Sequence, residues 1–158
     1  MEGERSGEKA MDDWKKELDD HFNELKTTKK EIKDRHENLK SEAKRFLKKS
    51  VMPAFLEIKT ELNRHKRECS LDSKKDWAVL LVKKNKKKEF VYEINLNADG
   101  DKLLASKSVY MPNEKGKLKL GVEGKIRNAG HSMRLDKITK DDILGDFLEE
   151  YKQATRVK

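Results

Sequence analysis

The chain has 158 residues, of which 34% are hydrophobic and 43% are charged, and its formal net charge is +8. Ordinary globular domains contain about 45–50% apolar and about 25% charged residues, so this chain cannot bury a large core along its whole length. Its only cysteine is Cys69, which excludes an intrachain disulfide and a multi-cysteine metal site.

No segment of the chain predicts secretion or membrane insertion. The longest uninterrupted apolar run, Ala78–Val82, is too short to span a bilayer. The polar stretch Met1–Ala10 lacks the apolar region of a secretory signal. We therefore expect a cytoplasmic protein without membrane contact. Its expected organisation is a disordered tail (1–10), a long helical arm (11–50) and a compact α+β domain (51–158).

A row of large apolar residues repeats every seven positions in the first third of the chain. Its members are Leu18, Leu25, Ile32, Leu39 and Phe46. Residues seven apart lie on nearly the same face of a helix, so the row predicts one long helix starting at Ala10 or Met11. With the row at position a of a heptad, the d positions are mixed: Trp14, His21, Thr28, Arg35 and Glu42. A tight parallel dimer prefers apolar residues at both a and d.

Three arrangements of this helix are consistent with the row. The helix can lie on its own domain with its charges in water, it can fold back as a hairpin near Thr27–Thr28, or it can pair with another helix. A helix of about 36 residues is about 54 Å long, whereas a domain made from the rest of the chain is about 30 Å across. This difference favours pairing. The predicted helix-pairing residues are Trp14, Leu18, Phe22, Leu25, Ile32, Leu39 and Phe46.

The apolar pattern changes phase near Pro53, a residue that kinks or breaks a helix. Leu47, Val51, Phe55, Ile58 and Leu62 follow steps of three and four, which predicts a second helix, about 53–67, that faces a sheet. The stretch 70–75 is expected to be a loop.

From Trp77 the apolar period shortens to two, which predicts strands. The expected strands are 77–82, 90–96, 102–110 and 118–122, with 132–138 as a candidate fifth. Asp99–Gly100 is a strong hairpin signal. Thr139 is expected to cap a last helix, in which Ile143, Phe147 and Tyr151 share one face. Because no helices separate the strands, the fold class is α+β: two helices, a four- to five-stranded antiparallel sheet, and a C-terminal helix on one sheet face.

No pattern of chemistry-bearing residues predicts an enzyme. The four histidines and Cys69 do not have the spacing of a metal site, and the glycines do not form a phosphate-binding loop. The paired carboxylates at 141–142 and 149–150 have ordinary explanations on a helix. We expect no catalytic residues, no cofactor and no metal.

The excess positive charge lies in one segment. Residues 73–138 hold 16 basic and 8 acidic side chains. Lysines near Phe90 and Tyr92 suggest contacts with phosphates and stacking on bases. Two observations count against this reading: these aromatics share a strand face with Ile94 and Leu96, which favours a core position, and lysine also protects sheet edges. The predicted polyanion-binding residues are Lys83, Lys84, Lys86, Lys87, Lys88, Lys115, Lys117, Lys119, Lys125 and Arg127.

Three functional hypotheses follow from the sequence, of which the weakest is a small enzyme with a site on the open face of the sheet. The first is a non-enzymatic interaction or scaffold protein whose helical arm forms a homodimer or docks a helical partner. The alternative is a binder of nucleic acid or another polyanion that acts through the basic β segment.

Overall fold

The computed structural model describes residues 2–100, 102–126 and 134–156, with side chains from Asp13 onward. The chain divides into two compact units, Met1–Asn38 and Leu39–Lys158. The first unit is helical. The second combines the end of that helix with two further helices and an antiparallel sheet, so the α+β fold class is confirmed.

Helix α1 spans Glu2–Phe46 without interruption. It begins earlier than the expected start at Ala10 or Met11, and the disorder expected of residues 1–10 stays a prediction. The helix continues through Thr27, whose hydroxyl donates to the carbonyl of Asn23 at 3.0 Å. A helical hairpin with a break near Thr27–Thr28 is therefore wrong.

A π-helical segment, η1 (Leu47–Val51), joins α1 to α2 (Met52–Arg64). The amide of Met52 donates to the carbonyl of Leu47, five residues earlier. Pro53, in the first turn of α2, has no amide hydrogen and its ring crowds the carbonyl four residues before it. A single wide turn relieves both constraints and rotates the apolar face. The phase change in the sequence is thus a π turn between helices.

Helix α2 ends where Lys66 adopts a left-handed backbone, with φ of 63°. The amide of Arg67 donates back to the carbonyl of Leu62 at 2.9 Å, and this carbonyl also accepts from the His65 amide at 3.0 Å, so the last turn of the helix closes on itself. The chain then enters β1 (Glu68–Lys74). The prediction of a loop at 70–75 is wrong, because this polar stretch pairs antiparallel with β2.

The sheet is a meander of five strands in the order β1-β2-β3-β4-β5. The other strands are β2 (Trp77–Lys84), β3 (Lys87–Asp99), β4 (Lys102–Pro112) and β5 (Leu118–Gly124). The predicted Asp99–Gly100 hairpin is present, with Asp99 opposite Lys102 and a positive φ at Gly100. The candidate strand 132–138 is not formed: Arg134 makes one bridge to Leu104, and Leu135–Lys137 is a 3₁₀ turn. Residues 132 and 133 lie outside the described residues.

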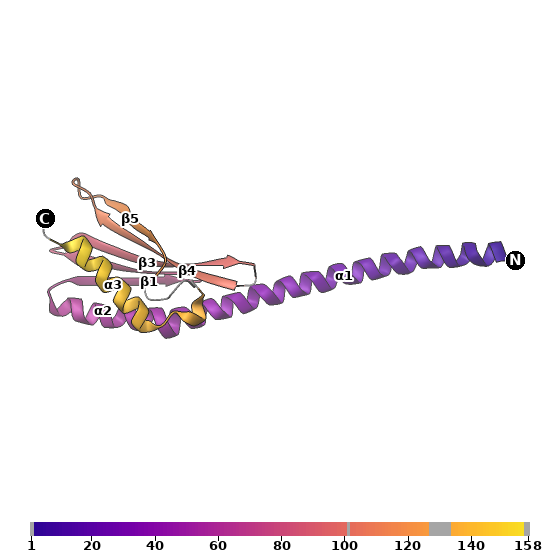
Figure 1. The fold of residues 1–158 in the computed structure, drawn as a ribbon, viewed down its shortest axis with the longest axis horizontal. Coiled ribbons are helices and arrows are strands. Elements are labelled where there is room, and N and C mark those ends of the chain that lie inside the picture. Colours follow the sequence, from indigo (N-terminus) through magenta and orange to yellow (C-terminus); the bar gives the residue numbers. More distant parts are fainter. Residues whose placement is uncertain (1, 101, 127–133, 157–158) are drawn as a thin grey trace. The chain divides into compact units, whose positions relative to one another are not determined.

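Helix α3 (Lys140–Thr155) starts with the predicted cap. The Thr139 side chain accepts a hydrogen bond from the Asp142 amide at 3.2 Å, and the Asp142 carboxylate accepts one from the Thr139 amide at 3.0 Å. Helices α2 and α3 lie on the same side of the sheet (Figure 1). The C-terminal helix therefore covers one sheet face, as the sequence predicts.

The core of the second unit lies between these helices and the inner face of the sheet. Phe147 of α3 makes edge contacts with Phe90 at 5.5 Å and Tyr92 at 5.6 Å between ring centroids, and it stacks on Tyr151 at 5.5 Å. Phe55 of α2 meets Tyr92 at 6.0 Å. Ala43, Phe46 and Leu47 also belong to this core, so the last turns of α1 belong to the second unit.

The outer face of the sheet is covered by neither α2 nor α3 (Figure 1). Strand register places Trp77, Val79 and Leu81 of β2 on this face, along with Tyr110 and Leu120 of the last two strands. These side chains are half-buried, and Leu120 is exposed. The second unit therefore has one sealed face and one face with accessible apolar side chains.

Replacing Phe147 with alanine should lower the free energy of unfolding by about 3–5 kcal/mol, because it removes a buried ring from three aromatic contacts. Urea unfolding followed by circular dichroism measures this change. The matched control is Leu148→Ala, since Leu148 is 49% exposed and its loss should cost within about 0.5 kcal/mol. Equal effects of the two substitutions would contradict this description of the core.

Candidate functional site

The apolar row on α1 is the first candidate site. Within the first unit, three members of the row and two neighbouring predicted helix-pairing residues are exposed: Leu18 by 43%, Leu25 by 43% and Ile32 by 44%, with Trp14 by 50% and Phe22 by 54%. Scattered exposed hydrophobic residues are ordinary, but a contiguous exposed patch marks an interaction surface. All residues from Asp13 to Asn38 are exposed.

The last two predicted helix-pairing residues lie in the second unit. Leu39 is half-buried and packs against the core, and Phe46 is buried in it. The seven predicted helix-pairing residues thus have two environments along one helix. Only the five residues from Trp14 to Ile32 remain accessible as a helix-pairing surface, and this division is not visible in the periodicity.

The predicted basic residues form a second candidate site at one end of the sheet. Lys83 lies opposite Lys88, and Lys84 opposite Lys87. Asn85 and Lys86 form the turn between them, with left-handed φ values of 51° and 67°. Like charges directly opposite each other destabilise a strand pair, so this hairpin tip carries an electrostatic cost.

The β4–β5 turn lies at the same end, because β3 begins and β4 ends there. This turn holds Lys115 and Lys117, whose amides donate to the Asn113 side chain at 2.9 and 3.0 Å. Lys119 lies on β5, and Lys125 follows the opposite end of that strand. Arg127 lies outside the described residues. The predicted set is therefore divided between the two ends of the sheet.

The aromatic residues near this tip cannot stack on bases. Phe90 and Tyr92 are fully buried on the inner face of the sheet, where they contact Phe147 and Phe55. A base-stacking platform needs exposed rings. Any binding of nucleic acid at this tip would depend on lysines alone.

A second group of lysines, which the sequence analysis did not single out, surrounds a hollow of about 480 Å³ at the other end of the sheet. The hollow is lined by Leu47, Met52, Ser73 and five lysines, Lys40, Lys44, Lys48, Lys74 and Lys75, without an acidic side chain. Within the described residues these lysines form no ion pair. The Lys74 ammonium lies 5.5 Å from the centre of the Trp77 ring.

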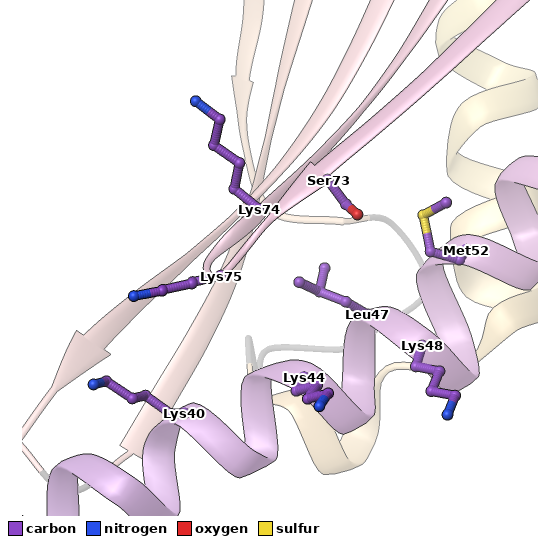
Figure 2. A pocket seen from close by; sticks show the side chains of 8 residues that line it. All are labelled: Lys40, Lys44, Leu47, Lys48, Met52, Ser73, Lys74 and Lys75. Carbon is purple, nitrogen blue, oxygen red and sulfur yellow. The ribbon is translucent and has the colours of Figure 1, made fainter.

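The side chains around this hollow do not converge on one point. Figure 2 shows Leu47 and Ser73 directed into the hollow, whereas the ammonium groups of Lys48, Lys74 and Lys75 point away from it. A compact anion needs several donors aimed at the same position. This geometry instead gives a diffuse positive rim around an apolar floor.

A buried charged cluster connects β4 to α3. The Lys107 ammonium donates to Asp146 at 2.5 Å and to Glu150 at 2.9 Å, and the Tyr92 hydroxyl donates to the other Asp146 oxygen at 2.6 Å. All four residues are at most 3% exposed. Burial, together with the Asp146 carboxylate, raises the pKa of Tyr92 well above its ordinary value, so Tyr92 remains a neutral donor.

This cluster, here called the Lys107 cluster, is sealed from solvent and has a structural role. A charge without a partner in a protein interior is costly, and each group here has at least one charged or hydrogen-bonding partner. The cluster is hidden in the sequence, because the Glu149–Glu150 pair has the pattern of a polar helix face. The available signal was a lysine, Lys107, at an inward position of an alternating strand.

The thiol of Cys69 and the hydroxyl of Tyr151 are both poor nucleophiles in this structure. Burial raises the pKa of Cys69 to about 11, and the reactive form of cysteine is the thiolate. Burial and a hydrogen bond to Glu89 raise the pKa of Tyr151 to about 12. Arg67 contacts the same carboxylate at 3.3 Å, so Glu89 of β3 connects the end of α3 to the segment between α2 and β1.

Neither a metal site nor a membrane-spanning helix is present in the described part of the chain. Its histidine, cysteine and acidic residues form no group of three that could hold a metal ion. None of its helices combines the length and the apolar character needed to cross a bilayer. Comparison of the chain with protein-family models, curated proteins and solved structures found no match.

Replacing Lys107 with methionine should lower the free energy of unfolding by about 3–5 kcal/mol, because the buried carboxylates of Asp146 and Glu150 lose the Lys107 ammonium as an ion-pair partner. Urea unfolding measures this loss, with the exposed Lys88→Met as the control for removing one lysine charge. A loss below about 1 kcal/mol for Lys107→Met would show that the carboxylates do not depend on this ammonium.

Proposed function

We propose that this chain is a non-enzymatic interaction protein that self-associates through the apolar row of α1. The observation that carries the proposal is the exposure of five large apolar side chains on one uninterrupted helix. Leu18, Leu25 and Ile32 repeat every seven residues, and a helix with an apolar stripe is stabilised mainly by packing that stripe against another surface. The row therefore has the chemistry of a helix-pairing surface.

The α+β unit supplies the rest of the scaffold. Its inner face is sealed by α2 and α3, and its outer face presents half-buried apolar residues such as Trp77 and Leu81. In this proposal α1 brings two copies together, and each copy presents a rigid unit for further contacts. The described residues hold no metal-ligating group of three, and the strongest side-chain cluster, around Lys107, is closed to a substrate.

Polyanion binding is the second candidate function, and a specific observation favours it. Twelve lysines lie in two groups, seven at the β2–β3 tip and the β4–β5 turn and five around the hollow between α1 and the β1–β2 turn. Opposed lysine pairs at the tip cost stability, and a polyanion would offset that cost by neutralising them. Contacts of this kind are independent of sequence and sensitive to salt.

Leu25→Glu should convert a dimer of twice the 18.5 kDa chain mass into a monomer. Each copy would place an unpaired carboxylate in the seam, which should weaken association at least about a hundredfold. Sedimentation equilibrium at micromolar concentration measures the mass. Leu56→Glu is the matched control, since Leu56 is 53% exposed on α2, outside the row, and it should leave the mass unchanged. A wild-type mass of 18.5 kDa at every concentration would refute self-association.

Fluorescence anisotropy with single-stranded and duplex oligonucleotides tests the second candidate. Binding should be measurable at about 50 mM salt and fall steeply by about 200 mM. Lys84→Glu/Lys87→Glu should reduce affinity at least about tenfold, by losing two phosphate contacts and adding two repulsions. Lys74→Glu/Lys75→Glu, at the other end of the sheet, shows whether the second lysine group contributes. Absence of binding at the lower salt concentration would remove this candidate.

A further inference from the structure

We propose that α1 pairs with α1 of a second copy of this chain in parallel orientation and in register, and that the charges beside the apolar row specify this orientation. The inference rests on the self-association proposed above and adds the direction and register of the partner helix. It requires one continuous helix through the row, which α1 provides from Glu2 to Phe46.

The two flanks of the row carry opposite charge. With Leu18, Leu25 and Ile32 at position a, the g positions before them are all glutamate, and the e positions are basic or aromatic. The g residues are Glu17, Glu24 and Glu31, and the e residues are Lys15, Phe22, Lys29 and His36. All of these side chains are exposed, so they are available to a partner helix.

This separation of charge favours a parallel pair. In a parallel pair each g residue faces the e residue of the next heptad on the other helix. Glu24 then faces the partner's Lys29, and Glu31 faces the partner's His36, which can donate a hydrogen bond to it. In an antiparallel pair g faces g and e faces e, so glutamates would meet glutamates and Lys15 or Lys29 would meet a basic residue. Like charges at such positions are destabilising.

The apolar residues lead to the same orientation. Parallel, in-register helices stack a residues on a residues and d residues on d residues, whereas antiparallel helices alternate a with d. Here the a positions are apolar and the d positions after Trp14 are polar: His21, Thr28 and Arg35. Only the parallel arrangement packs Leu18, Leu25 and Ile32 on their own counterparts. A shift by one heptad would lose one of these three layers, which sets the register.

Arg35 is the residue that opposes this pairing. At a d position two guanidinium groups approach each other across the seam, although their long stems can carry the charges outward to water. Association should therefore be moderate in strength. The position of Arg35 also provides a gain-of-function test. Arg35→Leu should tighten a parallel dimer at least about tenfold, because it replaces a repulsive layer with an apolar one.

Charge exchange between the two flanks tests the orientation without touching the apolar row. Glu24→Lys and Lys29→Glu should each weaken the dimer by about three- to tenfold, because each puts like charges face to face twice. The double variant Glu24→Lys/Lys29→Glu should return the dissociation constant to within about twofold of the wild type. Sedimentation equilibrium at low salt measures all four proteins. Failure of the double variant to recover would overturn the parallel arrangement.

Crosslinking tests the register. A short bismaleimide should link Leu18→Cys to itself and Ile32→Cys to itself. It should not link a tagged Ile32→Cys chain to an untagged Leu18→Cys chain, because 14 residues separate those positions by about 21 Å along a helix. The wild-type chain, whose buried Cys69 is its only thiol, is the background control.

The possible results separate this inference from the proposed function. A dimer that links only 18 to 32 is either antiparallel or parallel with a shift of two heptads, and a dimer that links none of these positions has another register. Either result overturns the inference and leaves self-association in place. A protein that stays monomeric at every concentration overturns both.

Discussion

The packing of α2 and α3 on one face of the sheet is the constraint on which the rest of the second unit depends. Phe147 and Phe55 reach Tyr92 from the two helices, so a single buried ring connects both of them to β3. A sheet with one apolar face must bury it against another layer, and these helices form that layer. The π turn before Pro53 belongs to the same constraint, because it rotates the apolar face so that Val51 and Phe55 enter the core.

The Lys107 cluster lies within this layer and makes it specific. Apolar contacts alone would tolerate small shifts of α3 along the sheet, whereas two carboxylates one helical turn apart must both meet one ammonium. The Tyr92 hydroxyl adds a directional bond from the ring that the helices share. Buried polar groups of this kind define one arrangement when every member has a partner. The cluster therefore fixes the position of α3 on the sheet.

The apolar side chains of the first helical segment have different surroundings in the two units. In the second unit, the chain's own core buries Ala43, Phe46 and Leu47. In the first unit, the apolar side chains from Trp14 to Ile32 are exposed between an acidic and a basic flank. The charged faces of such a helix interact favourably with water, whereas its apolar row is more stable when it packs against another surface. The proposed scaffold follows from that contrast, with the lysine groups of the α+β unit as a separate candidate surface.

The sequence by itself determined the features that depend on neighbouring residues. The heptad row, the Asp99–Gly100 hairpin, the Thr139 cap, the continuous apolar run of β2 and the alternation of β3 are local patterns. Each predicted its element, and together they predicted the α+β class. Only the tertiary structure decided the rest. Strand β1 has only two apolar inward residues, Cys69 and Leu71, which is too few for a recognisable strand pattern. Its identity as a strand becomes clear only from its pairing with β2. Long-range contacts likewise decide the burial of Phe46, the burial of Phe90 and the partners of Lys107. These contacts join segments far apart in the chain, so no local periodicity predicts them.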